Sequence, residues 1–475
     1  MKIRDGSVLV GLLWCLALLS VLVVGLLYSA RLDLRVVKNH GDSIQAYYLA
    51  VAGVEKAKAL LHQDLIDRSR SGQNHSVALY NAPREFKDVR LGRGQFSVMR
   101  PAAQDEGGGS IYGVEDEESR LNVNTASSQE MAKLDRMLPE TAAAILDFRD
   151  GDDATTTGGA EADYYASLRP PYMPRNGPFQ TARELLWVRG VDRELFWGED
   201  ANQNGVLDPE ENDGKASPPL DNGDGVLDMG WAALITVDSS VKNVNASGQE
   251  RVDLASADER ALLGVKGITQ EIARAIIAWR DQRKFESVAD LLDLTPANPQ
   301  RAPNPAGVNT GTSQSPPSGR ASPAAVPQRS PVSQAQQNVP AQPSGIKLIG
   351  IDKLVELADD FTTTSDKDLP GLVNINTASR SVLICLQGIT PEIAQAIVNH
   401  RQSAGSFPNT AALLKVPGVT PEVYKRVSAR VSARSETFRI TSEGRIPSSG
   451  ARKRIETIVR VNSQNVTTLS CREDL

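Results

Sequence analysis

Apolar residues fill the N-terminal part of the chain and then continue in a helical pattern. The run from Ser7 to Leu27 contains no charged residue, and about 20 apolar residues allow a helix to cross a hydrocarbon core of roughly 30 Å. Beyond this run, apolar side chains recur at helical spacing as far as Tyr47 and Val54. The pattern predicts one continuous helix over residues 7–62, apolar on all sides at its start and amphipathic towards its end.

Short stretches that alternate apolar and polar residues lie on either side of a longer helical region, and this alternation is typical of half-buried strands. They are residues 76–80, 94–98, 438–440 and 455–461. We expect a pilin-like β region formed by residues 63–115 and 436–462, with an antiparallel hairpin at the C-terminal end. The predicted fold class is α+β, with a long N-terminal helix, a small antiparallel sheet, a helical body and a C-terminal β-hairpin.

A repeat occupies the middle of the chain. The sequence from Leu121 to Ser127 recurs almost intact from Val373 to Ser379, and a degenerate copy covers residues 252–257. Each copy leads into a helix, a short turn, a second helix and then half of another such pair, and Ser or Thr precedes the helices as an N-cap signal. This pattern resembles helix-hairpin-helix units, of which the first is interrupted between residues 149 and 184.

The composition changes abruptly after the second copy. Residues 297–345 are rich in Pro, Ser, Gln, Ala and Asn and contain almost no large apolar side chain. Such a segment cannot bury enough surface to offset its chain entropy. We therefore expect a disordered linker that separates a helical domain at 116–296 from a second helix-hairpin-helix domain at 346–435.

Two loops after the first copy carry oxygen side chains at the spacing of calcium-binding loops. Gly205 takes the sixth position of the first loop, where the turn requires a positive φ. A ligand set made only of oxygen atoms suits calcium better than zinc, so we expect a structural calcium ion. The predicted ligands are Asp200, Asn202, Asn204, Val206 through its carbonyl, Asp208 and Glu211 in the first loop, and Asp221, Asn222, Asp224 and Asp228 in the second.

A further set of acidic residues is a weaker candidate for metal binding, and solvated carboxylates are the simpler interpretation. This set contains Asp150, Asp152, Asp153, Glu161 and Asp163.

The start of the chain resembles type IV pilins and type II secretion pseudopilins, in which a prepilin peptidase cuts after a glycine and leaves the helix in place. The resemblance implies a leader at residues 1–6 and a cut between Gly6 and Ser7. It also implies a single-pass protein of the bacterial inner membrane with its globular part in the periplasm. Most members carry a glutamate at the fifth mature position, which is Gly11 here. The K pseudopilins lack this glutamate.

Motifs in residues 116–197 resemble the K pseudopilin (GspK) family more specifically. They are Asp116 to Asn124 as its acidic opening, Phe148 to Asp153 as its acidic box, Gly159 to Tyr165 as its GAE-x-x-YY element, and Asn176 to Leu186 as its N-x-PF…EL segment. The resemblance implies a minor pseudopilin at the tip of a type II secretion pseudopilus, without catalytic residues. Its implied partners are other minor pseudopilins, the inner-membrane secretion platform and the prepilin peptidase.

The alternative function is DNA binding, because the third repeat also resembles competence-type DNA receptors. The net charge of −6 argues against nucleic acid as the main ligand, since phosphate binding requires a basic face. Thr269, Thr390 and Thr420 also replace the second hairpin glycine, which would allow the closest approach to a phosphate. A disulfide between Cys385 and Cys471 stays open at this point, because two cysteines define no framework.

Overall fold

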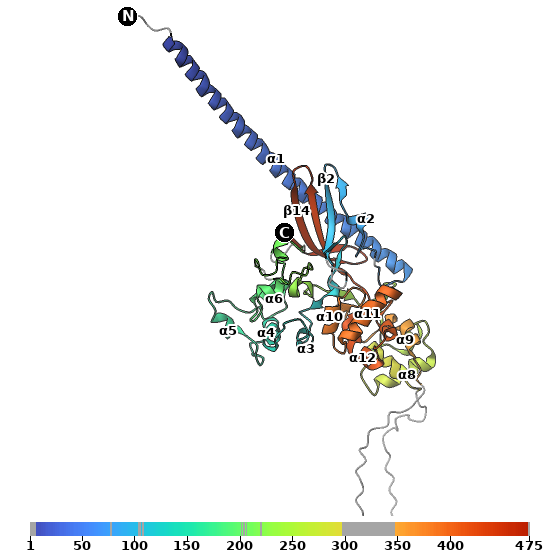
Figure 1. Cartoon of the computed structure of the whole chain (residues 1–475). Helices are drawn as coiled ribbons and strands as arrows, with labels where there is room; N and C mark the ends of the chain where they lie inside the picture. Colours follow the sequence, from blue (N-terminus) through green and yellow to red (C-terminus); the bar gives the residue numbers. More distant parts are fainter. Residues whose placement is uncertain are drawn as a thin grey trace, which may run out of the picture.

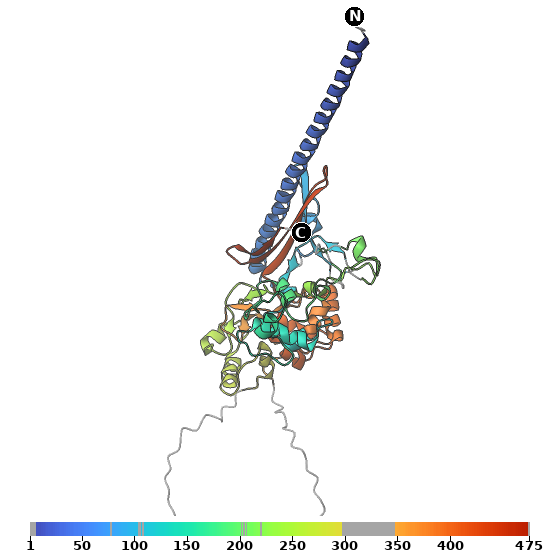
Figure 2. The same cartoon turned by 90° about the vertical axis from the view of Figure 1, so that its left-hand side faces the viewer.

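The computed structural model describes residues 6–76, 78–102, 106, 109–200, 202, 205, 207–218, 221–296 and 347–473. A long helix, α1, runs from Gly6 to Ser71. Its N-terminal half extends away from the rest of the chain, and its C-terminal half packs against an antiparallel sheet (Figure 1). A helical body lies beyond the sheet, at the end away from the N-terminus (Figure 2). The predicted α+β class is confirmed, and α1 ends nine residues later than expected.

The sheet has seven strands, in the order β1-β2-β13-β14-β15, with β3 paired to β2 and β4 to β13. The predicted strand at 94–98 and the C-terminal hairpin are confirmed as β2 and as β13 with β14. The sequence patterns did not indicate β15, which adds an edge strand to the hairpin. The bounds are β1 (Val89–Leu91), β2 (Gly94–Pro101), β3 (Ser110–Ile111), β4 (Glu115–Asp116), β13 (Thr437–Ile446), β14 (Ala451–Val461) and β15 (Val466–Arg472), with a short helix α2 (Pro83–Phe86) before β1.

The predicted strand at 76–80 is wrong for the residues that the structure describes there. Residues 78–80 form a turn, and a single backbone hydrogen bond joins Val114 N to Leu79 O. Leu79 is only 9 % exposed, and the Tyr80 ring stacks on His75. The alternation of apolar and polar residues therefore reflects burial of a turn against the body of the protein.

The helical body consists of three units with one topology, at residues 121–236, 252–362 and 373–432. In each unit a short strand opens the repeat and pairs in parallel with a short strand at its end: β5 with β6, β8 with β9, and β11 with β12. Between these strands lie a helix pair, a 3-10 helix and a last helix.

The first unit contains β5 (Leu121–Asn122), α3 (Ser128–Met131), α4 (Pro139–Arg149), α5 (Ala162–Ala166), η3 (Ala182–Trp187), α6 (Arg193–Trp197), η4 (Pro209–Glu211), η5 (Gly230–Ala233) and β6 (Ile235–Thr236), and η2 (Glu117–Ser119) precedes it. The second contains β8 (Val252–Asp253), α7 (Glu259–Leu263), α8 (Gln270–Arg280), η6 (Val288–Asp293), α9 (Ile351–Leu357), η7 (Ala358–Asp360) and β9 (Phe361–Thr362). The third contains β11 (Val373–Asn374), α10 (Arg380–Cys385), α11 (Pro391–Ala404), η8 (Thr410–Lys415), α12 (Pro421–Val427), η9 (Ser428–Arg430) and β12 (Val431–Ser432). β7 (Ser240–Lys242) and β10 (Asp368–Pro370) pair between the units.

The division of the body at 297–345 is wrong, because α9 completes the second unit. Its buried residues Leu354 and Leu357 correspond to Tyr424 and Val427 of α12, and β9 then pairs with β8. Leu348 N donates a hydrogen bond of 2.9 Å to Leu294 O across the insertion. The Pro/Ser/Gln-rich segment itself lies outside the described residues. It is inserted where the third unit has the short Pro417–Gly418 turn.

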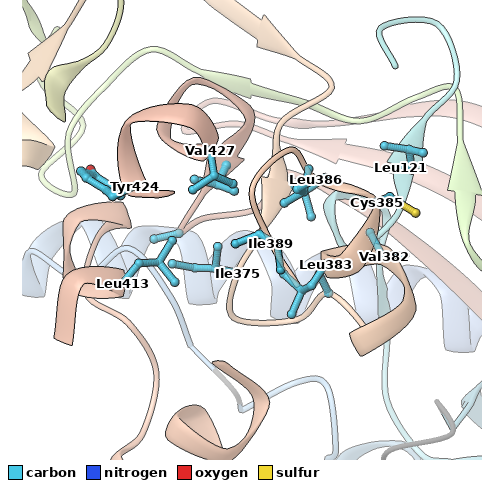
Figure 3. Packing of buried hydrophobic residues seen from close by; sticks show 14 of the residues in the cluster. Leu121, Ile375, Val382, Leu383, Cys385, Leu386, Ile389, Leu413, Tyr424 and Val427 are labelled. Atoms are coloured by element: carbon cyan, nitrogen blue, oxygen red, sulfur yellow. The ribbon is translucent and has the colours of Figure 1, made fainter. Parts of the chain in front are cut away.

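One hydrophobic core runs through all three units, so they form one body. Figure 3 shows part of this core, in which Leu121 of the first unit joins Ile375, Leu413 and Val427 of the third. The third unit contacts both others: Lys133 of the first unit donates to Leu386 O, and Lys425 of α12 pairs with Asp293 of η6. Cys385 is buried in α10 and Cys471 is exposed on β15, and both are free thiols, so the disulfide does not form.

Candidate functional site

The exposed half of α1 carries most of the exposed large apolar side chains of the described chain. Side chains from Leu9 to Gly41 are all exposed, with Trp14 at 69 % and Val21 at 70 %. A window of this helix has a mean hydropathy of 2.7, which is enough for a membrane span by length and composition. The described part of the chain therefore has one helix that can anchor it in a bilayer.

The first predicted calcium loop brings carboxylates together at the junction of α6 and the sheet. Asp200 is 2 % exposed and Glu211 3 % exposed. Asp200 Oδ2 accepts a hydrogen bond of 3.0 Å from Gly205 N, and Gly205 has φ 66°, as the pattern predicts. Burial, followed by the nearby charges of Asp200 and Asp208, raises the pKa of Glu211. Asn204 and Val206 lie outside the described residues.

The second predicted loop uses its side chains mainly to shape its own backbone. Asp221 Oδ1 accepts from Gly223 N, Asn222 Oδ1 from Asp224 N, Asp224 Oδ1 from Val226 N, and Asp228 Oδ1 from Gly230 N. The buried carboxylate of Glu199 accepts hydrogen bonds from the backbone of Asn222 and Asp228, at the two ends of the loop. These side chains close local turns, so this loop has the weaker geometry for a cation.

A compact carboxylate cluster, in contrast, forms where Asp150 of the acidic box meets Asp147 and Glu161. Oxygen atoms of Asp147, Asp150 and Glu161 lie within 4.8 Å of one another, and this is the one such group of three acidic, His or Cys side chains in the described residues. Asp147 is fully buried and Glu161 is 4 % exposed. Neither Glu161 oxygen has a hydrogen-bond partner. Such a carboxylate is costly to bury unless a proton or a cation compensates its charge.

The position of Glu161 in this cluster raises the pKa of its carboxyl group. Burial raises the pKa of Glu161 to about 7, and the charges of Asp147 and Asp150 act in the same direction. Gly159 lies so close to the Asp147 carboxylate that a side chain at this position would overlap it. Asp147 was missed in the sequence, because it lies within α4, where it belongs to the helical pattern. Asp152, Asp153 and Asp163 are exposed, as the simpler interpretation expects.

The repeated Asn residues have structural roles in the hairpin units. Asn376 Oδ1 accepts from Phe407 N at 2.7 Å, and its Nδ2 donates to the backbone oxygens of Phe407 and Ala433. Asn124 makes the equivalent pair of bonds with Phe179 in the first unit. An Arg residue at or near the end of each second helix donates back to the opening turn: Arg149 to Ala126 O, Arg280 to Ala257 O and Arg401 to Ala378 O.

The hairpin turns carry a negative charge where a phosphate would bind. Six helices of the three units have an acidic residue at their second position, namely Glu140, Glu194, Glu271, Asp352, Glu392 and Glu422. Thr390 and Thr420 also cap α11 and α12, where they accept from Ile393 N and Val423 N. Hydrogen bonds from Thr390 and from the backbone lower the pKa of Glu392, which is therefore ionised. A carboxylate in the first turn occupies the favourable end of the helix dipole.

A long apolar helix packs on an antiparallel sheet, and a helical body is inserted between the sheet strands β4 and β13. This is the arrangement that the resemblance to pilins leads us to expect. Family models match three segments. Residues 119–197 match type II secretion system (T2SS), protein K, and residues 247–300 and 371–432 match the helix-hairpin-helix motif.

Three curated relatives each match part of the chain. The type II secretion system protein K of Pseudomonas aeruginosa is 26 % identical over 39 % of this chain and 57 % of its own length. The mouse endonuclease/exonuclease/phosphatase family domain-containing protein 1 is 26 % identical over 39 % of this chain and 28 % of its own length. The ComE operon protein 1 of Bacillus subtilis is 27 % identical over 18 % of this chain and 42 % of its own length. The matches thus span less than two thirds of each relative.

The GspK-GspI-GspJ complex of the enterotoxigenic Escherichia coli type 2 secretion system contains a chain that aligns with 92 % of this chain and 99 % of its own length, at 13 % identity and a TM-score of 0.44. The first unit is therefore similar to type II secretion system protein K, both in the family model over residues 119–197 and in the Pseudomonas relative.

Proposed function

We propose that this protein is a minor pseudopilin at the tip of a type II secretion pseudopilus. The main support for the proposal is the position of the helical body, which lies beyond the sheet on the side away from the N-terminus of α1 (Figure 1). A body of three units at this end is too bulky for repeated stacking in a filament. Gly11, in place of the usual glutamate, removes a buried charge that would need a partner on the subunit ahead. Both features suit a leading subunit.

The proposal places the protein in the bacterial inner membrane by a single helix, with the globular part in the periplasm and a prepilin peptidase cut between Gly6 and Ser7. Residues 1–5 lie outside the described part of the chain. N-terminal sequencing of the protein extracted from membranes tests the cut, with Ser7 as the expected first residue. A first residue of Met1 would contradict processing.

Other minor pseudopilins and the inner-membrane secretion platform are the proposed partners, which act by binding and without chemistry on a substrate. Co-purification from detergent tests this with substitutions at two exposed leucines. Leu34, on the free half of α1, is 69 % exposed, and Leu91, on the edge strand β1, is 53 % exposed. Leu34→Asp should lose the minor pseudopilins, whereas the control Leu91→Asp should retain them. Equal retention by both variants would contradict packing through α1.

Calcium is the proposed structural ion, and the carboxylate cluster around Asp150 is its best-supported site. Asp147, Asp150 and Glu161 supply three carboxylates, which are ligands that calcium prefers. The first loop, through Asp200 and Glu211, is the second site proposed. Calcium at 100 times its Kd would stabilise the fold by about 2.7 kcal/mol.

Thermal unfolding with a chelator and with calcium tests both sites. Glu161→Gln should reduce the calcium-dependent rise in melting temperature, and Asp200→Asn should remove the contribution of the first loop. A melting temperature that calcium leaves unchanged in the full chain would contradict calcium binding at either place.

DNA binding by the hairpin units is the competing function, in view of the matches to helix-hairpin-helix proteins. The acidic residue at the second position of six of the hairpin helices argues against it, because a carboxylate repels phosphate where backbone N–H groups would bind it. A gel-shift with duplex DNA at physiological salt distinguishes the two functions. No shift is expected, and tight binding that weakens with salt would favour the competing function.

A further inference from the structure

Three consecutive acidic residues are buried where the chain leaves the sheet and enters the helical body. Asp116 is the last residue of β4, and Glu117 and Glu118 begin η2. Asp116 is 2 % exposed, and Glu117 and Glu118 are fully buried. The three side chains reach different parts of the protein, so the cluster forms a joint between the sheet and the body.

Glu117 has the partners that a buried charge requires. Arg439 Nε of β13 donates to it at 2.6 Å, and Thr236 of β6 donates to its other oxygen. Burial alone would raise the pKa of Glu117, but the positive charges of Arg439 and Arg120 outweigh it, so the pKa is lowered. Glu117 is therefore ionised.

Asp116 and Glu118 differ from Glu117, because neither has an ion pair among the described residues. The Asp116 carboxylate accepts from Glu118 N at 2.8 Å, from Ser435 Oγ at 2.6 Å and from Asn374 Nδ2 at 3.1 Å, and Thr377 also donates to it. Three of these four donors belong to the third unit or to the segment that follows it.

Glu118 accepts from two backbone groups, Ser240 N of β7 and Thr437 N of β13, each at 3.1 Å. Its own N–H donates to Asp116 Oδ1, so the two carboxyl groups belong to one buried site that has no ion-pair partner for either among the described residues. Two neighbouring carboxylates cannot both be ionised in such a site, so one of them carries a proton. Asp116 receives four donors and Glu118 only two, which favours the charged form at Asp116.

We propose that Glu118 carries this proton and donates it to Asp116, so that the pair joins the helical body to the sheet only while the proton is bound. Loss of the proton would place two negative charges side by side between β13 and the third unit. This inference is independent of the pseudopilin function and of calcium.

The surroundings agree with a neutral Glu118. Burial and the adjacent Asp116 charge raise its pKa well above that of an ordinary glutamate, and burial also raises the pKa of Asp116. The titratable and charged groups around the pair are Arg68 on α1, His75 and Tyr80 before α2, Glu115 on β4, Glu117 and Arg120, Asp238 before β7, Arg434 and Glu436 before β13, Arg439 on β13 and Glu456 on β14.

Infrared spectroscopy of the full chain in detergent at pH 7.5 tests the proton directly. A protonated carboxyl group has a carbonyl stretch that is distinct from that of a carboxylate. The measurement is made in a Glu161→Gln background, because Glu161 has a pKa of about 7 and would contribute to the same band. We expect the band in this background, its loss on Glu118→Gln, and its retention on Glu117→Gln.

Amide hydrogen exchange of the unsubstituted protein provides a second measurement that does not depend on folding of the variants. Protection at Ser240 and Thr437, the two amides bound by Glu118, should fall as the pH rises beyond what the intrinsic exchange rate explains. Amides of the β14–β15 pair serve as the control and should stay protected. Absence of the protonated band, its persistence in Glu118→Gln, or equal loss of protection in both sets of amides would overturn the proposal.

Discussion

Removal of residues 297–346, with Pro296 joined directly to Lys347, tests whether the second unit is one folded unit with an inserted segment. The structure supports closure of the gap, because Leu348 N already donates to Leu294 O at 2.9 Å. Asp293 also lies 3.5 Å from the Lys347 ammonium. We expect the shortened protein to keep its fold and to gain stability.

The magnitude follows from loop closure. In the full chain the ends of the hairpin turn, Leu294 and Leu348, are joined by roughly 50 residues, and the deletion leaves about four. The entropic cost of closing a loop grows as (3/2)RT ln n, so the deletion should stabilise the closed unit by about 2 kcal/mol. Since one core runs through the three units, they should unfold together, and the melting temperature should rise by a few degrees.

The assay is thermal unfolding of the full and shortened chains in the same detergent, with hydrogen exchange of the α8 amides as a local measurement. A variant in which Gly and Ser replace residues 297–346 at equal length is the matched control, and it should unfold like the unsubstituted chain. The reasoning is refuted if the deletion lowers the melting temperature or removes protection from α8, as expected if the segment had separated two domains.

Three further predictions follow from single positions. Arg136 has φ 55° at the turn where the other units have Gly267 and Gly388, so Arg136→Gly should stabilise the protein by about 1 kcal/mol in denaturant unfolding, and Arg136→Ala, which keeps the backbone strain, should not. Without calcium, stability should fall as the pH rises from about 4.5 to 7, because the pKa of Glu161 is raised to about 7 in the folded state, and a slope unchanged in Glu161→Gln would contradict this. Asn376→Ala should cost about 3 kcal/mol, since it leaves the buried N–H of Phe407 without an acceptor and removes two further bonds; a cost below 1 kcal/mol would show that the site relaxes.

Local sequence patterns were enough to predict the long helix, the hairpin of β13 and β14, and the repeated openings. Each of these features is visible in a short stretch of sequence, either as regularly spaced apolar residues or as a capping residue at the start of a helix. Ser379 is such a capping residue, because its side chain accepts a hydrogen bond from Val382 N. The turn at 78–80 was mistaken for a strand because tertiary burial of Leu79 and Tyr80 imitates the alternation of a half-buried strand. The spacing of apolar residues alone cannot distinguish a buried turn from a half-buried strand.

The missed features depend on contacts between distant segments. The sequence near α9 does not indicate the last helix of a hairpin unit. Gly350 stands where the third unit has the capping residue Thr420, and the insertion takes the place of the turn before it. Only the pairing of β8 with β9 and the common core place α9 in the second unit. Asp147 likewise becomes a candidate ligand only when the chain returns 14 positions later with Glu161. A spacing of this kind has no local signature.

The hairpin units explain how a motif associated with DNA can serve for packing. A hairpin that binds DNA leaves backbone N–H groups free for phosphate, and glycine allows the close approach. Here Thr390 accepts from Ile393 N, and Glu392 adds a negative charge in the same turn. The same turns face the protein itself: Gly388 lies against the Arg426 side chain, and Gly267 lies against Lys353. A neighbouring helix of the same unit therefore covers each of these two glycines, which favours a compact body over a nucleic-acid surface.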